Sequence, residues 1–174
     1  ELKRYFGYEG HLTGANAKSV WDHCQAVIGD GLHVRGILKQ SNVTLVCTTD
    51  DPADTLEWHE KLAADPFLET KVLPAFRPDK AVNLEQEGFP AYLERLSAAA
   101  GMEIHDWRSL TAALDRRMDF FTDHGCAVAD HGLDNLCFRT AGVPALDAIL
   151  KRRLAGERPT ETELWQYKTA LLLF

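Results

Sequence analysis

The sequence predicts an α/β fold in which a small helical module precedes a parallel sheet built from βα units. Before about residue 40 the apolar residues recur at helical spacing and no strand-like run occurs. From residue 42 onward, short apolar segments alternate with amphipathic helices, which is the pattern of βα units. Polar residues gather directly after the apolar segments, where parallel folds place their working side chains.

The helical module is predicted over residues 1–41. Residues 15–28 carry apolar side chains at helical spacing, and the glycines that follow are typical of a helix C-terminus. A second, shorter helix is expected at residues 33–40, and residues 1–6 also have a helix-like pattern. We therefore expect this part to be a small all-helical subdomain.

Residues 42–174 are predicted to contain three parallel strands, at residues 43–47, 71–76 and 126–129. Pro52 is expected to open the helix after the first strand, with Asp51 as its cap. Pro74 lacks a donor for the sheet and predicts an irregular second strand. The third segment is continuously apolar, which is typical of a parallel strand covered on both faces.

Four further helices are predicted, at residues 90–100, at 106–122, at 143–154 and from residue 160 onward. Gly101 and Gly125 are expected to end the first two, and Thr160 with Glu163 forms a capping box for the last. Three βα units cannot close a barrel, and an open sheet leaves its edges unpaired. Together with the apolar final residues, this predicts a segment of a longer protein, for which association into a homo-oligomer is one way to cover the edges.

Composition narrows the possible partners and the compartment. The net charge of −7 disfavours nucleic acid and anionic membranes, which both attract clustered positive charge, and no apolar run approaches the roughly 20 residues that span a bilayer. The four cysteines, Cys24, Cys47, Cys126 and Cys137, show no CxxC pair. They are predicted to be free thiols in a reducing cytoplasm, and Cys24, Cys47 and Cys126 are expected to be buried because they lie in apolar stretches.

Polar clusters follow all three predicted strands: residues 48–52, 76–79 and 130–134. Arg77 is the first choice for ligand binding, because a guanidinium can hold a carboxylate through two parallel hydrogen bonds. The alternative for Arg77 is an ion pair with Asp79 or Asp51.

His131 is a candidate proton shuttle or metal ligand because its unperturbed pKa lies near neutrality, and a supporting role in its loop is the alternative. Only one of Asp130 and His131 is expected to face the interior if the strand continues. Asp50 is a candidate for catalysis or ligand contact, whereas His59 is expected to be structural. Since no HxH pair is present, no metal ligands are predicted in this chain.

Two long runs carry a family resemblance, CTTDDPADTLEWH at residues 47–59 and KVLPAFRPDK at residues 71–80. With ADHGLD at residues 129–134 and ELKRYF at residues 1–6, they strongly resemble the uronate (glucuronate) isomerases. The resemblance implies an amidohydrolase-superfamily TIM barrel, of which this chain would be a part, with the helical subdomain as an insertion. It also implies that Arg77 contacts the substrate carboxylate.

The implied reaction is aldose–ketose isomerisation of D-glucuronate to D-fructuronate, and of D-galacturonate to D-tagaturonate, in cytoplasmic carbohydrate metabolism. A divalent metal, with zinc expected, is implied for the full-length parent, with its ligands outside this chain. The isolated segment is therefore expected to be inactive. The alternatives are a catalytically inactive structural segment and a related amidohydrolase acting on another substrate.

Overall fold

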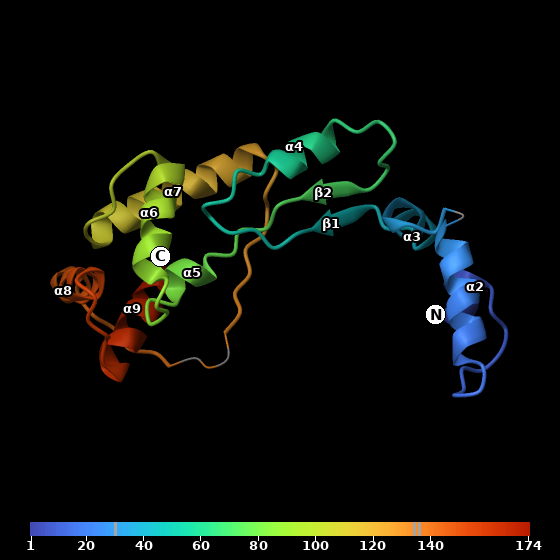
Figure 1. The fold of residues 1–174 in the computed structure, drawn as a ribbon. Helices are drawn as coiled ribbons and strands as arrows, with labels where there is room; N and C mark the ends of the chain where they lie inside the picture. The colour runs from blue at the N-terminus through green and yellow to red at the C-terminus, as the bar shows by residue number, and fades with distance from the viewer. Residues whose placement is uncertain (30, 134, 136) are drawn as a thin grey trace. The chain divides into compact units, whose positions relative to one another are not determined.

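The computed structural model describes residues 1–29, 31–133, 135 and 137–174. Helices predominate, and the small sheet is parallel, so the predicted α/β class is confirmed (Figure 1). The chain divides into an N-terminal unit of residues 1–46 and 61–72 and a main unit of residues 47–60 and 73–174. A domain boundary at residue 41 stays a prediction. Within the described ranges, no helix is long and apolar enough to cross a membrane.

The described residues of the N-terminal unit form the predicted helices α1 (Leu2–Phe6), α2 (Ala17–Gly29) and α3 (Val34–Gln40). The Tyr5 hydroxyl lies 3.0 Å from the Ser41 hydroxyl, at the end of α3. The ammonium of Lys39 lies 2.6 Å from the Glu69 carboxylate, which ties α3 to the segment that leads into the second strand.

The two strands are β1 (Leu45–Cys47) and β2 (Lys71–Leu73), and parallel pairing continues beyond both of them. Asp50 bridges to Phe76, and Phe76 bridges in turn to Ala129. The second strand is shorter than predicted, since the Ala75 N–H donates to the Asp50 side chain at 3.2 Å and not to the backbone of the first strand.

The predicted third strand at residues 126–129 was wrong as an element, since only one bridge forms there. Phe76 N–H donates to the Val128 carbonyl at 3.0 Å, and Asp130 N–H donates to the Phe76 carbonyl at 3.3 Å. Val128 is 47% exposed, so this segment is not covered on both faces. Its apolar sequence predicted a buried strand, but the described residues leave the segment partly exposed. The predicted burial of the cysteines was also wrong, since Cys47 is exposed and Cys24 and Cys126 are only partly buried.

The helix after the first strand, α4 (Glu57–Ala63), begins five residues later than Pro52, where it was predicted to begin. Asp51 Oδ1 accepts from the Ala53 N–H at 2.9 Å, and Asp54 Oδ1 accepts from the Leu56 N–H at 2.8 Å. These bonds fold the segment into successive turns instead of a helix. Leu56 consequently takes a left-handed φ of 57°.

The main unit holds the longer helices, and the predicted signals delimit them well. Gly101 ends one helix with a left-handed φ of 63°, and Thr160 and Glu163 form the predicted capping box. A second capping box, formed by Asp106 and Ser109, was not predicted. The helices are α5 (Asp79–Val82), α6 (Phe89–Ala100), α7 (Trp107–Asp123), α8 (Val143–Leu154) and α9 (Glu161–Leu173). Of these, only α5 was not expected.

The hydrophobic core lies in the main unit, where α5 to α9 pack around buried aromatic rings. Phe89 and Trp107 both make edge-on contacts with Tyr167, whose hydroxyl donates to the Ala81 carbonyl at 2.8 Å. Two buried cations, Arg117 and Arg153, satisfy backbone carbonyls inside this core. The core thus fixes α5, which begins two residues after Arg77.

Candidate functional site

Arg77 lies where the pairing between the first two strands ends, and two carboxylates orient its side chain. Its N–H donates to the Asp50 carbonyl at 2.9 Å, so the parallel pairing fixes its backbone. Guanidinium Nη2 lies 3.1 Å from Asp130 Oδ2, and Nε lies 3.3 Å from Asp79 Oδ2. Nε is buried without a hydrogen bond, so the contact with Asp79 is an ion pair lacking hydrogen-bond geometry. Neither ion pair uses Nη1.

Asp79, the first residue of α5, joins the second polar cluster to the third. Its Oδ2 and Oδ1 accept from the Gly132 N–H at 3.0 and 3.2 Å. A Cβ at Gly132 would come within 2.9 Å of Asp79 Oδ2, so this close approach requires glycine. Asp79 Oδ1 also lies 3.6 Å from His131 Nδ1. One carboxylate therefore contacts both Arg77 and the loop that carries His131.

His131 is partly exposed, with 30% of its side chain accessible. Because Asp79 faces Nδ1, Nε2 is the ring nitrogen farther from the carboxylate, and it can exchange a proton with a ligand. Asp130 and His131 both reach the cluster, contrary to the expected alternation, because the chain is no longer a strand after Ala129. Asp134, the last residue of the predicted cluster, lies outside the described residues.

The Asp50 side chain lies in a different environment, although its carbonyl accepts from Arg77. Its Oδ2 accepts from the Thr48 hydroxyl at 2.6 Å and from the Ala75 N–H at 3.2 Å. His59 Nε2, from α4, lies 2.7 Å from the Thr48 hydroxyl and 3.7 Å from Asp50 Oδ2. These contacts hold α4 against the strand ends, which suits the structural role expected for His59. A catalytic role for Asp50 stays a prediction.

Asp51 also differs from its predicted role, since it caps a turn rather than a helix and pairs with Lys80 at 3.2 Å. Arg77 was expected to pair with Asp79 or Asp51 if its role were structural, and the observed partners are Asp79 and Asp130. Sequence reasoning did not identify the Asp130 contact. In the sequence, only the adjacent pair Asp130-His131 pointed to a contact of this kind.

The described part of the chain contains no complete metal site of its own. Its residues include no group of three or more His, Cys, Asp or Glu side chains that could hold a metal ion. The cluster around Arg77 can instead bind an anion through the guanidinium and transfer a proton through His131. Anion binding together with proton transfer suits an acidic substrate.

Comparison with known proteins identifies the family. The profile of the family described as glucuronate isomerase matches residues 1–174. The uronate isomerase of Lachnospira eligens is 45% identical over 174 residues, which are 99% of this chain and 37% of that protein. The uronate isomerase of Yersinia pseudotuberculosis serotype O:1b is 47% identical over 176 residues, covering 100% of this chain and 38% of that protein.

A solved structure gives the same result in three dimensions. The uronate isomerase of Thermotoga maritima superposes with a TM-score of 0.91 at 27% identity, over 99% of this chain and 38% of that chain. The chain thus spans somewhat more than a third of the length of the relatives it matches. This coverage agrees with the predicted segment of a longer protein.

Proposed function

Because the chain belongs to the glucuronate isomerase family, we propose that the protein containing it isomerises uronates between their aldose and ketose forms. The substrates are D-glucuronate, converted to D-fructuronate, and D-galacturonate, converted to D-tagaturonate. In this proposal the chain contributes part of a TIM barrel with residues 1–41 as a helical insertion, and the enzyme works in the cytoplasm. The match to the Thermotoga maritima enzyme supports the barrel assignment.

The observation that carries the proposal is the placement of Arg77. Its guanidinium is held at the carboxyl end of the parallel strands by Asp79 and Asp130, and Nη1 takes part in neither ion pair. An arginine fixed in this way presents a directed donor to an incoming carboxylate with little ordering cost. Arg77 therefore suits the sugar-acid carboxylate, the one group that distinguishes a uronate from a neutral sugar.

Proton transfer between C2 and C1 of the sugar is the chemical step, and it needs a group that can both accept and release a proton. We assign this role to His131, whose Nδ1 faces Asp79 at 3.6 Å. A neighbouring carboxylate fixes the ring orientation, as in other catalytic histidines. Asp50 is the second proposed catalytic residue, and the Thr48 hydroxyl, which donates to its Oδ2 at 2.6 Å, orients its carboxylate.

A divalent metal, with zinc expected, belongs to the proposal for the full-length protein only. The donor set of the described residues does not fit a metal centre, so no step of the proposed mechanism is assigned to a metal. Ligands outside this chain and association of copies both stay predictions.

Replacing Arg77 with Gln in the full-length protein tests the proposal. Removal of one partner from a charged, hydrogen-bonded pair weakens binding by about 2–5 kcal/mol, so kcat/KM for D-glucuronate should fall by about 100-fold. Arg108→Gln is the matched control, because Arg108 is exposed on α7 and takes no part in the Arg77 cluster. Unchanged turnover in Arg77→Gln would refute the assignment of Arg77. Absence of isomerase activity in the wild type would refute the function itself.

A further inference from the structure

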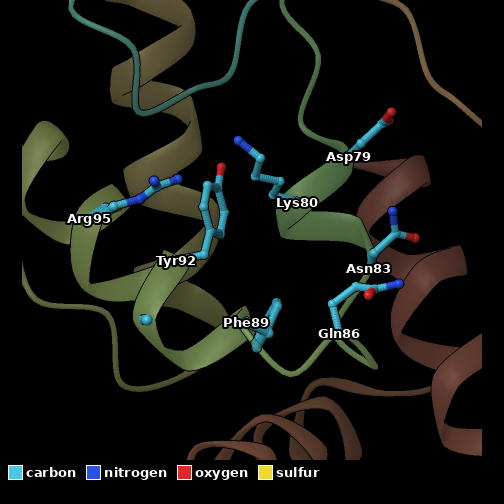
Figure 2. Close-up of a pocket in the computed structure, with 9 residues that line it drawn as sticks. Asp79, Lys80, Asn83, Gln86, Phe89, Tyr92 and Arg95 are labelled. Atoms are coloured by element: carbon cyan, nitrogen blue, oxygen red, sulfur yellow. The ribbon is translucent and has the colours of Figure 1, made fainter.

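A second cavity lies beside the candidate site, between α5 and the start of α6 (Figure 2). Its volume is about 420 Å³, within the range of small-molecule sites. It shares Asp79 with the Arg77 cluster, but neither Arg77 nor His131 lines it. Its lining residues are Asp79, Lys80, Asn83, Gln86, Gly88, Phe89, Ala91, Tyr92 and Arg95. The cavity is therefore a separate binding space within the main unit.

The hydroxyl of Tyr92 is a buried donor without a partner in this cavity. The residue is only 4% exposed, and the hydroxyl makes no hydrogen bond of ordinary geometry, although the Asp51 carboxylate lies close enough to interact with it. Figure 2 shows it directed to the side of the cavity where the Lys80 and Arg95 head groups lie. Burial raises the pKa of the Tyr92 phenol above its usual range, and the nearby Asp51 carboxylate adds to this rise. The hydroxyl thus stays protonated, and its poorly aligned contact with Asp51 leaves it able to donate to a ligand.

The charges around the cavity leave one cation without a balancing carboxylate. The charged residues that line the cavity are Asp79, Lys80 and Arg95, so the lining itself carries one net positive charge. Outside the lining, Asp51 pairs with Lys80 at 3.2 Å, and Asp79 also pairs with Arg77 at 3.3 Å. Arg95 forms no ion pair within the described part of the chain and packs over the Tyr92 ring, 5.6 Å from its centroid. The surplus is a single positive charge. A carboxylate balances it, whereas a phosphate dianion would leave an uncompensated negative charge.

The opposite side of the cavity is polar, and hydrogen bonds from a buried arginine hold its backbone in place. Asn83 and Gln86 contribute their amides, and the ring of Phe89 forms an apolar wall between them and Tyr92 (Figure 2). Arg153 donates to the carbonyls of Leu84 and Gln86, both at 2.7 Å. These bonds fix the loop that carries the amides, so the cavity is formed before a ligand enters.

We propose that this cavity binds a small hydroxylated carboxylate. The carboxylate accepts from the Arg95 guanidinium and the Tyr92 hydroxyl, and the hydroxyl groups of the ligand face the amides of Asn83 and Gln86. The surplus charge selects the acid group, and the amides select a polar body over a hydrocarbon chain. The proposal does not depend on the isomerase reaction.

Calorimetric titration of the full-length protein with D-gluconate tests this site, with the neutral polyol D-sorbitol and inorganic phosphate as comparison probes. Tyr92→Phe removes only the hydroxyl, and Arg95→Gln removes only the charge. Each should weaken D-gluconate binding by about tenfold or more, because each loses a hydrogen bond to a charged group. Arg108→Gln is the control for loss of one exposed arginine and should bind D-gluconate as the wild type does.

Arg77→Gln separates this cavity from the candidate site, since D-gluconate could also bind at Arg77. A tight binding event that survives Arg77→Gln and is lost in Arg95→Gln supports the proposal. Binding lost only in Arg77→Gln would overturn it, as would wild-type affinity in both Tyr92→Phe and Arg95→Gln. Equal affinity for D-sorbitol or for phosphate would also overturn it. Circular dichroism of each variant confirms that the fold is intact before the titrations are compared.

Discussion

Arg117 offers a sharp test of how the main unit is held together. This arginine of α7 is only 6% exposed, and three backbone carbonyls surround its guanidinium. It donates to Pro52 at 2.6 Å, to Asp54 at 2.7 Å and to Ala99 at 3.1 Å. The guanidinium also stacks over the Phe120 ring, 4.0 Å from its centroid. The turns that carry Asp51 and Asp54 are therefore anchored to α7 by a single side chain.

Replacing Arg117 with Met keeps most of the apolar volume and removes every donor. Hydrogen bonds that involve a charged group contribute about 1.5–3 kcal/mol each. Water can reach part of the turn that contains Pro52 and Asp54, so the three losses do not add fully. We expect the free energy of unfolding to fall by about 3–5 kcal/mol, a large share of the roughly 5–15 kcal/mol typical of a domain. For Arg117→Lys the fall in the free energy of unfolding should be about half as large. A single ammonium cannot reach all three carbonyls, which the planar guanidinium reaches through its fork of N–H donors.

Urea unfolding followed by tryptophan fluorescence measures both variants, since Trp107 is buried in the same unit. Arg116→Gln is the control, because the neighbouring Arg116 is exposed and its loss should change stability by less than about 0.5 kcal/mol. A loss below about 1 kcal/mol in Arg117→Met would show that the buried bonds do not anchor the turns. Equal stability of Arg117→Lys and the wild type would refute the geometric part of the argument.

Two further predictions concern α9 and α4. Thr160→Ala should lower the free energy of unfolding by about 1 kcal/mol, because it removes the side-chain cap. Hydrogen bonds from Thr160 lower the pKa of Glu163 below its ordinary 4.5. Their stabilisation is present above that pH and lost as pH falls through the folded value, so acid unfolding curves of Thr160→Ala should depend less on pH. A hydrogen bond that His124 Nε2 donates to the Glu60 carboxylate raises the pKa of His124 above 6.5. The stabilisation from this bond is present below pH 6.5 and disappears as pH rises through the folded pKa, and Glu60→Gln should lower the His124 pKa in an NMR titration.

The elements that sequence predicted best are those with local signals at their ends. The helix at residues 143–154 has the predicted bounds, and the one that follows begins at its capping box. The start of α4 failed because Asp51-Pro52 is compatible with both a helix cap and a turn. The choice depends on Asp54, whose side chain bonds the Leu56 N–H and stops helix formation. A side chain that competes with the backbone for an N–H group leaves no periodic pattern in the sequence, so this helix start could not be predicted.

The candidate site was predictable in part for the same reason. Arg77 stands between an apolar strand and a proline, so its place at the strand end follows from the local sequence. Its pairing with Asp130 depends on a bridge between distant segments, which the apolar pattern alone cannot place. The cavity residues had a weaker signal: Tyr92 and Arg95 are three residues apart and share one face of α6. That the Arg95 charge and the Tyr92 hydroxyl face one cavity follows only from the packing of α5 beside α6.

The two carboxylates beside Arg77 have unequal roles under the proposed function. With both of them ionised, the cluster carries one more negative than positive charge, so a substrate carboxylate must displace one of them. Asp79 is 25% exposed and accepts from the Gly132 N–H, whereas the Asp130 side chain is 48% exposed. Separating Asp130 from Arg77 therefore costs less than separating Asp79, which also faces His131. The proposed function therefore assigns Asp79 as the fixed support of the guanidinium, and Asp130 as the partner that the sugar carboxylate displaces from Nη2 when it also binds Nη1.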